Sequence, residues 1–124
     1  MYGTNKFGAK KTWYNGRLYD SKAEAKYSNL LDVYFAEGYI KSIEYQVKYP
    51  LENMDGKKRL RYVADFVVTD NNDNEFILDV KGCLTPANIV KLSYFQFVHK
   101  KKVILIPTTG IKAFNFDWLE VSDE

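Results

Sequence analysis

Two aspartates and a lysine have the residue types and spacing to bind a metal ion and act on a phosphate. Asp65 interrupts the otherwise apolar residues 63–68, and Asp79 follows the apolar residues 76–78, with Lys81 two positions further along. Carboxylate oxygens are the ligands that Mg²⁺ prefers, and bound Mg²⁺ usually keeps several of its waters. A lysine beside the metal can hold or deprotonate a water and stabilise negative charge on a phosphate in the transition state. These residues therefore predict phosphodiester hydrolysis.

The prediction depends on the two aspartates meeting in space, because an isolated Asp-x-Lys segment on a strand is more often a solvent-exposed pair. Residues 60–69 and 75–81 have strand-like sequences, and a run of Asp and Asn residues between them favours a turn. If the turn is centred on Asn72, Asp65 and Asp79 lie equally far from the centre and face each other. Directly opposed residues of an antiparallel pair share a face, with Cβ atoms roughly 4.5–5.5 Å apart.

The same register predicts how the other side chains of the two strands are divided. The expected pairs are Thr69 with Glu75, Val67 with Ile77, and Val63 with Lys81. The side chains expected on the opposite face, where they form the core, are those of Phe66, Val68, Phe76, Leu78 and Val80. Opposed like charges destabilise a sheet unless a cation neutralises them, so this register favours a bound divalent cation. The backbone carbonyl of Val80 could be a further ligand, whereas a bulge in the turn would break the pairing.

Glu24 and Gln46 are candidates for completing the site. Glu24 lies on the apolar stripe of a predicted helix over residues 22–37, so its side chain leans toward the sheet. There it could bind a second metal or reach the first through water, although a capping-box contact with Ser21 is a comparable alternative. Gln46 lies on the polar side of an alternating strand over residues 43–49. It could contact the metal-bound water or remain a surface glutamine.

The N-terminal part of the chain is predicted to form a hairpin, a helix and a strand. Asn15-Gly16 favours a type I′ turn within an arm over residues 1–20. Gly38 fits the C-terminal stop of the helix. Pro50 is expected to end the strand that contains Gln46.

A second helix and a fourth strand follow the two central strands. Thr85 is a good N-cap with Pro86 in the first turn, which predicts a helix to about His99. Residues 103–106 are apolar throughout and predict a strand that is buried on both faces. The order α-β-β-β-α-β predicts an α/β (α+β) fold in which helices flank a central mixed sheet.

The length and composition suit one domain with a substantial core. The chain has 124 residues, of which 46% are hydrophobic and 16% aromatic, and it shows no repeat, low-complexity tract or linker. We expect a single domain over residues 1–124, with its core at residues 21–107. An aromatic tail at residues 108–124 is expected to pack on the edge of that core.

The same composition excludes several classes of protein. The apolar runs are too short to span a bilayer, and the chain does not start with the pattern of a signal peptide. Cys83 is the single cysteine, which excludes an intramolecular disulfide and a cysteine-cluster zinc site and favours a reducing, cytoplasmic setting. His99 is the single histidine, which argues against a histidine-based metal site or triad.

Basic residues gather in clusters, although the formal net charge is only +2. Such clusters can follow the phosphates of a nucleic acid, but most of them are solvated loops and helix ends. The candidates for DNA contact are Lys10, Lys11, Arg17, Lys22, Lys57, Lys58 and Arg59. A third group, at residues 100–102, follows the second predicted helix.

Several segments carry a resemblance to known nucleases. Asp65 with Asp79-Val80-Lys81-Gly82 resembles the bipartite motif of the PD-(D/E)XK nuclease superfamily, and the predicted element order resembles its restriction-endonuclease-like core. A closer resemblance, to small phage-encoded proteins grouped with Holliday-junction resolvases and related endonucleases, spans about residues 5–107. It is carried by Asn5-Lys6-Phe7-Gly8-Ala9-Lys10-Lys11, Asp20-Ser21-Lys22-Ala23-Glu24-Ala25 and Tyr62-Val63-Ala64-Asp65-Phe66.

This resemblance implies a role for each candidate residue of the site. Asp65 and Asp79 would be ligands of Mg²⁺ or Mn²⁺, and Lys81 would be the catalytic lysine. Glu24 would be the acidic residue of the first helix, and Gln46 matches a glutamine often found on the strand before the motif.

The resemblance also points to Lys91 and contains one departure. Lys91 falls where many such nucleases place a basic residue near the scissile phosphate, although a solvated helical lysine is the simpler interpretation. Ala64 stands where the name of the superfamily has proline, which is among the less constant letters of the motif.

We therefore expect a Mg²⁺- or Mn²⁺-dependent endodeoxyribonuclease that acts on branched DNA, in phage recombination or packaging. Because resolving a junction requires two cuts, this activity implies a homodimer with two active sites. One alternative is a restriction-like or transposase-like nuclease that depends on a partner for targeting. The other is a DNA-binding module without catalysis, against which the intact set of Asp65, Asp79 and Lys81 argues.

Overall fold

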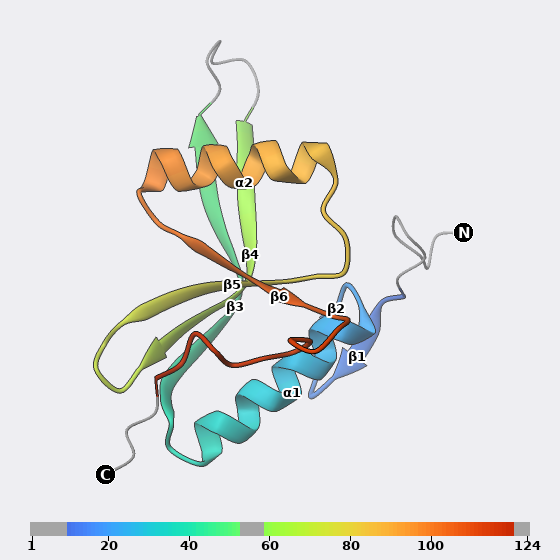
Figure 1. Cartoon of the computed structure of the whole chain (residues 1–124), viewed down its shortest axis with the longest axis vertical. Helices are drawn as coiled ribbons and strands as arrows, with labels where there is room; N and C mark the ends of the chain where they lie inside the picture. Colours follow the sequence, from blue (N-terminus) through green and yellow to red (C-terminus); the bar gives the residue numbers. More distant parts are fainter. Residues whose placement is uncertain (1–9, 53–58, 121–124) are drawn as a thin grey trace.

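A four-stranded sheet lies between two helices in the computed structural model, which describes residues 10–52 and 59–120 (Figure 1). The helices are α1 (Lys22–Ala36) and α2 (Pro86–His99). The sheet contains β3 (Ile40–Glu52), β4 (Arg59–Asp70), β5 (Glu75–Lys81) and β6 (Val103–Pro107), in this spatial order. Strands β3, β4 and β5 are antiparallel neighbours, whereas β5 and β6 are parallel. The mixed sheet and the order α-β-β-β-α-β confirm the predicted fold class.

A short hairpin precedes the first helix. Its strands, β1 (Thr12–Tyr14) and β2 (Arg17–Tyr19), are joined by Asn15 and Gly16, whose φ angles are 53° and 77°. A type I′ turn requires positive φ at both central residues, so the predicted turn is confirmed.

Both helices begin and end at the predicted signals. The Ser21 hydroxyl accepts a hydrogen bond from the Glu24 backbone N–H at 3.1 Å, and the Thr85 hydroxyl accepts one from the Asn88 N–H at 3.2 Å. These bonds satisfy N–H groups that lack a partner within the first turn. After α1, Gly38 has a φ of 85°, which glycine adopts without a steric penalty.

Two predictions about strand ends and burial are wrong, and both errors concern edge strands. β3 continues through Pro50, which lies opposite Arg61, and ends at Glu52. β3 is an edge of the described sheet, so the missing N–H of proline need not remove a ladder bond. β6 forms the other edge, and Leu105 is 38% exposed there. The prediction that this strand is buried on both faces is therefore wrong.

The register between β4 and β5 agrees with the prediction over most of the hairpin. Thr69 pairs with Glu75 and Val67 with Ile77. The side chain of Asp70 sets the turn, because it accepts hydrogen bonds from the backbone N–H groups of Asn72 and Asn74 at 2.9 and 2.8 Å. Such a local side-chain bond is the usual way in which aspartate stabilises a turn.

The predicted pair of Val63 with Lys81 is wrong. The described pairing between the two strands ends at Phe66 and Leu78. Beyond this point the aspartate side chains, described below, bond to the backbone of the opposite strand in place of the ladder.

Each face of the sheet carries its own core. The core on the α1 side contains Tyr27 and Leu31 of α1. As predicted, this side also receives the hairpin residues Phe66, Val68 and Leu78, with Phe76 and Val80 packed against them. The core on the α2 side contains Leu92 and Phe95 of α2, with Val67 and Ile77 of the sheet. The face expected to carry the carboxylates is therefore covered by a helix.

Strand β4 changes face at Asp65. Tyr62 and Ala64 belong to the core on the α2 side, whereas Phe66 and Val68 belong to the core on the α1 side. Residues two apart on a regular strand share a face. The alternation is therefore interrupted between Ala64 and Phe66.

Strand β3 changes face opposite this point. Tyr45 packs on the α1-side core and Val47 on the α2-side core, and Gln46 between them has a φ of 52°. A non-glycine residue rarely adopts this left-handed conformation. The prediction of one uninterrupted alternation over residues 43–49 is therefore wrong.

The described part of the C-terminal tail packs into the core on the α1 side. Phe116 stacks on Tyr27 and Tyr34, with ring centroids 4.8 and 4.0 Å apart. The indole N–H of Trp118 donates to the Tyr27 hydroxyl at 2.8 Å, and its ring lies 5.0 Å from that of Phe76. In Figure 1 the tail runs alongside α1.

Within the described ranges, no helix has the length and apolar character needed to cross a membrane.

Replacing the buried tryptophan should reveal how much the tail contributes to stability. Trp118→Ala should lower the free energy of unfolding by about 3–5 kcal/mol, because it removes a large buried ring and leaves a cavity. The matched control is Trp13→Ala, since Trp13 is 71% exposed and its replacement should change stability by less than about 0.5 kcal/mol. Urea unfolding of both variants measures the difference. Equal small losses would contradict the packing of the tail.

Candidate active site

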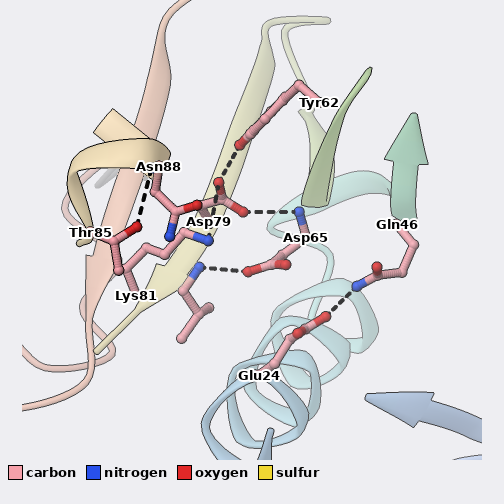
Figure 2. Close-up of polar contacts among 9 residues, drawn as sticks. Glu24, Gln46, Tyr62, Asp65, Asp79, Lys81, Thr85 and Asn88 are labelled. Atoms are coloured by element: carbon pink, nitrogen blue, oxygen red, sulfur yellow. Dashed lines mark hydrogen bonds and ion pairs between the residues drawn. The ribbon is translucent and has the colours of Figure 1, made fainter. Parts of the chain in front are cut away.

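Asp65 and Asp79 lie next to each other where β4 and β5 stop pairing (Figure 2). The backbone N–H of Asp65 donates to Asp79 Oδ1 at 3.2 Å, and the backbone N–H of Val80 donates to Asp65 Oδ2 at 2.8 Å. Each carboxylate thus bonds to the opposite strand. The structure brings together the two aspartates that the register predicted to meet, and it does so through side-chain bonds to the backbone.

Tyr62 and Lys81 bind or approach the second aspartate from the side of α2. The Tyr62 hydroxyl donates a hydrogen bond to Asp79 Oδ2, and the Lys81 ammonium lies 4.0 Å from the same oxygen. Only 1% of the Asp79 side chain is exposed, compared with 30% for Lys81. The pair is therefore asymmetric, because the carboxylate is enclosed while the amine reaches solvent.

Sequence reasoning missed Tyr62. The predicted register would place this residue opposite Gly82, and regular alternation would put it on the face away from Asp65. Tyr62 reaches Asp79 only because β4 changes face at Asp65. The sequence carries no separate signal for that irregularity.

Glu24 approaches the same region from α1 and contacts Gln46. Glu24 is 4% exposed, and its carboxylate accepts a hydrogen bond from the Gln46 side-chain amide. In Figure 2 this carboxylate points to Gln46, whereas that of Asp65 points to the Val80 backbone. Glu24 therefore faces the sheet, as expected from its helical stripe, while Ser21 caps its backbone N–H. Gln46 contacts Glu24 and is not an isolated surface residue.

The three carboxyl groups have raised pKa values, chiefly because they are buried. Burial raises the pKa of Asp65 well above its usual range, and the charges of Asp79 and Glu24 raise it further. Burial, followed by the charges of Asp20 and Asp79, raises the pKa of Glu24 to about 7. Burial also raises the pKa of Asp79, which Lys81 and the hydrogen bond from Tyr62 oppose. Three carboxyls with raised pKa values form a region where a cation would be stabilised.

The donors suit a hard divalent cation, although they do not form a coordination sphere as they stand. In residues 10–52 and 59–120, no three side chains of His, Cys, Asp or Glu are arranged to hold a metal ion. An ionised carboxylate has about four acceptor sites, and the hydrogen bonds given above use two on Asp79 and one on Asp65. Acceptor capacity therefore remains on both aspartates, and oxygen donors are the kind that Mg²⁺ prefers.

A basic cavity opens beside Asp79 on the α2 side of the sheet. Its volume is about 160 Å³. The polar and charged side chains that line it come from three elements: Arg61 and Tyr62 of β4, Asp79 and Lys81 of β5, and Asn88 and Lys91 of α2. Lys91 is an exposed helical lysine that lines this cavity. Arg61 belongs to the mid-chain basic cluster of the sequence, whereas Asn88 is a further candidate that sequence reasoning did not single out.

The other basic candidates lie elsewhere in the chain. Lys10, Lys11, Arg17 and Lys22 belong to the hairpin region and the start of α1. Lys57 and Lys58 lie outside the described residues, and for Arg59 the structure describes only the backbone, which pairs with Glu52. Lys100, Lys101 and Lys102 line a separate cavity with Glu75 at the start of β5. Among the described residues, neither the hairpin group nor residues 100–102 line the cavity beside Asp79.

Comparison with known proteins gives one match. A protein-family model described as "Protein of unknown function (DUF1064)" matches residues 4–113. No curated protein and no solved structure matches the chain. The nuclease resemblance therefore stays a prediction at this point.

The raised pKa of Glu24 predicts how stability depends on pH without metal. The folded state holds the Glu24 proton up to about pH 7, against an ordinary value of 4.5. The protonated Glu24 carboxyl therefore contributes its full stabilisation below about pH 4.5. As the pH rises through 7 this contribution is lost, and the free energy of unfolding falls by on the order of 3 kcal/mol. Urea unfolding in EDTA between pH 5 and 8 should show a steeper loss for wild type than for Glu24→Gln.

The exposed residue Glu44 of β3 provides the control for this measurement. Glu44→Gln should keep the pH dependence of wild type. Identical profiles for wild type and Glu24→Gln would mean that Glu24 ionises without hindrance in the folded protein.

Proposed function

The chain belongs to the DUF1064 family, whose model covers most of its length, and we propose that it is a metal-dependent endodeoxyribonuclease. The proposed reaction is hydrolysis of a phosphodiester bond in DNA with Mg²⁺ or Mn²⁺ as cofactor. The proposed substrate is branched DNA, cut by a homodimer with two active sites, in phage recombination or packaging within the host cytoplasm. The substrate, the dimer and the pathway follow from the resemblance to small phage-encoded junction-resolving endonucleases.

The observation that carries the proposal is a group of three carboxyl residues, one of which, Asp79, lines a basic cavity. Asp79 and Glu24 are almost fully buried. The charges of both residues raise the pKa of Asp65. Burying like charges is unfavourable unless a cation compensates them. Lys81 and Lys91 line the adjoining cavity, where they would attract an anion. A cation site next to an anion site is the arrangement that phosphodiester hydrolysis requires.

The residues that would hold the metal are Asp65 and Asp79, with Glu24 and the backbone carbonyl of Val80 as further donors. When bound there, a divalent cation would polarise the phosphate and lower the pKa of a coordinated water.

The protein's own groups have separate roles in the proposed reaction. Tyr62 orients Asp79 through its hydroxyl, and Gln46 orients Glu24 through its amide. The Lys81 ammonium, 4.0 Å from Asp79, would stabilise negative charge that builds on the phosphate and hold the attacking water. Arg61, Asn88 and Lys91 would bind phosphate oxygens in the cavity.

A DNA-binding module without catalysis would not need this arrangement. Phosphate binding requires cations on the surface, whereas carboxylates repel phosphates, and the charges of Asp79 and Glu24 raise the pKa of Asp65. A solvent-exposed Asp-x-Lys pair is also a poor description, because Asp79 is buried and bonded to Tyr62.

Replacing one aspartate should greatly slow cleavage without destabilising the fold. With Mg²⁺ or Mn²⁺, wild type should cut four-way-junction DNA faster than linear or nicked DNA of matched sequence, and EDTA should stop it. Asp79→Asn should lower the rate by at least about 100-fold, since it weakens the hold on the metal, while the thermal midpoint stays the same or rises. A nuclease rate in Asp79→Asn close to that of wild type would exclude this site as its source.

Lys81→Ala tests the division of roles within the site. This variant should lose about 100-fold or more in cleavage rate, because a charge-stabilising donor is gone, but should keep its stabilisation by Mn²⁺. Stabilisation is measured as the shift in thermal midpoint on adding Mn²⁺. Lys48→Ala on β3 is the control, since Lys48 is an exposed lysine that does not line the cavity. Loss of the Mn²⁺ shift in Lys81→Ala would contradict the role given to this lysine.

A further inference from the structure

The outer face of α2 is apolar and exposed. Lys91 is the only Asp, Glu, Lys or Arg among the 14 residues of this helix, in a chain of which 27% of the residues are charged. A helix that covers a sheet usually carries charged and polar side chains on the side away from it. Leu92 and Phe95 point into the core, so side chains half a turn away from them point outward. The exposed fractions are 49% for Ile89, 68% for Val90 and 71% for Phe97.

The apolar surface continues from α2 onto the edge strand β6. α2 packs mainly over β3 and β4 (Figure 1), and a hollow of about 150 Å³ lies between α2 and β6. Leu84, Ile89 and Leu105 line this hollow, and Leu84 and Leu105 are 37% and 38% exposed. Residues 103–107 of β6 carry no charge, whereas edge strands are commonly protected from further association by charged side chains. The α2–β6 face is therefore one continuous apolar surface.

This face is large enough to form an interface. Single exposed apolar side chains are common on protein surfaces, but a contiguous patch marks a site of interaction. Together the exposed apolar side chains offer several hundred Å², which is of the same order as the about 800 Å² per partner that a standard interface buries. The side chains that form the α2–β6 face are those of Leu84, Ile89, Val90, Phe97, Val98 and Leu105.

The scarcity of charge on this face indicates what covers it. A nucleic acid would require cations there, but Lys91 lies on the flank of α2 that lines the cavity beside Asp79. A charged peptide would find no groups of opposite sign. In a two-fold contact, each residue near the axis lies close to its own copy, so a charged face would repel itself. A face without charge suits a second copy of the same chain.

The order of residues along α2 also suits a two-fold contact. Two α2 helices that cross antiparallel at Ser93 would place Phe97 of one copy against Ile89 of the other, because each lies four residues from Ser93. Ser93 is small and exposed, which allows the two helices to approach closely. The projecting Phe97 ring would then meet the hollow that Ile89 lines. Each copy thus offers both a projection and a recess.

We propose that the α2–β6 face is the interface of a homodimer, in which α2 packs antiparallel on its own copy about a two-fold axis near Ser93. The inference rests on the proposed function only for the need of two active sites, and it identifies the surface that joins them. Leu105 lies beside Asp79 in the register of β6 and β5, so the interface adjoins the strand of the proposed metal site. Lys91 lies on the flank of α2 opposite Ile89, which leaves the cavity open in the dimer.

Sedimentation of the protein alone, over a series of concentrations in EDTA, tests the interface. Wild type should form a dimer. Phe97→Arg should weaken dimerisation by at least about 100-fold, because the change enters the contact twice and places a charge in an apolar surface. Phe35→Arg is the matched control, since Phe35 is 52% exposed but lies on α1, and its dimer should be as stable as that of wild type. Circular dichroism should show that both variants keep the fold.

Crosslinking tests the position of the axis without removing an apolar side chain. In a Cys83→Ser background, Ser93→Cys should give a disulfide-linked dimer on mild oxidation, because the two Cα atoms at the axis would lie within reach of a disulfide, about 4.4–6.8 Å. Ser42→Cys in the same background is the control. Ser42 is an exposed serine on β3, at the other edge of the sheet, and should not crosslink.

Two results would overturn the inference. The first is a wild type that stays monomeric at every concentration. The second is a dimer that Phe97→Arg leaves intact and Ser93→Cys does not link, which would assign self-association to another face. Either result would leave the proposed cleavage chemistry in place, since that chemistry fails if metal-dependent cleavage survives Asp79→Asn. A dimer joined through the α2–β6 face would stand even then.

Discussion

The candidate site depends on how β4 and β5 are joined at Asp65 and Asp79. At this point the backbone ladder gives way to two bonds from backbone N–H groups to carboxylates, one in each direction across the strands. The same point is where β4 changes face, so Tyr62 reaches Asp79 while Phe66 enters the other core. If these bonds were replaced by ordinary pairing, the carboxylates would no longer be enclosed between the strands and the cavity.

Burying these carboxyl groups lowers the stability of the folded protein. Buried carboxylates with raised pKa values weaken the metal-free protein near neutral pH, and the surrounding aromatic and aliphatic cores must offset that loss. The cores lie on both faces of the sheet, so the strands are held firmly on either side of the irregular segment. Rigid support of this kind keeps charged groups in place when they would otherwise separate. The basic cavity then sits directly against the enclosed Asp79.

Much of this could be predicted from the sequence because the signals were local. Asn15-Gly16, Ser21 and Thr85 each determine a turn or helix start through their own backbone and side-chain preferences, and the Asp70 turn sets the register that brings Asp65 to Asp79. The face change at Gln46 and Asp65 could not be predicted. It depends on packing against two helices at once, and a glutamine with positive φ gives no warning in its sequence. The role of Tyr62 was missed for the same reason.

The central proposal is that Asp65 and Asp79 hold a divalent cation, with Glu24 as a further donor. The most direct measurement is X-ray diffraction from a crystal of the protein soaked in Mn²⁺, with data collected at the manganese absorption edge. The account predicts an anomalous peak within coordination distance of carboxylate oxygens of both Asp65 and Asp79, about 2.0–2.6 Å away. A peak confined to other acidic residues, such as the exposed Asp73, or no peak with the Tyr62–Asp79 bond intact, would contradict it.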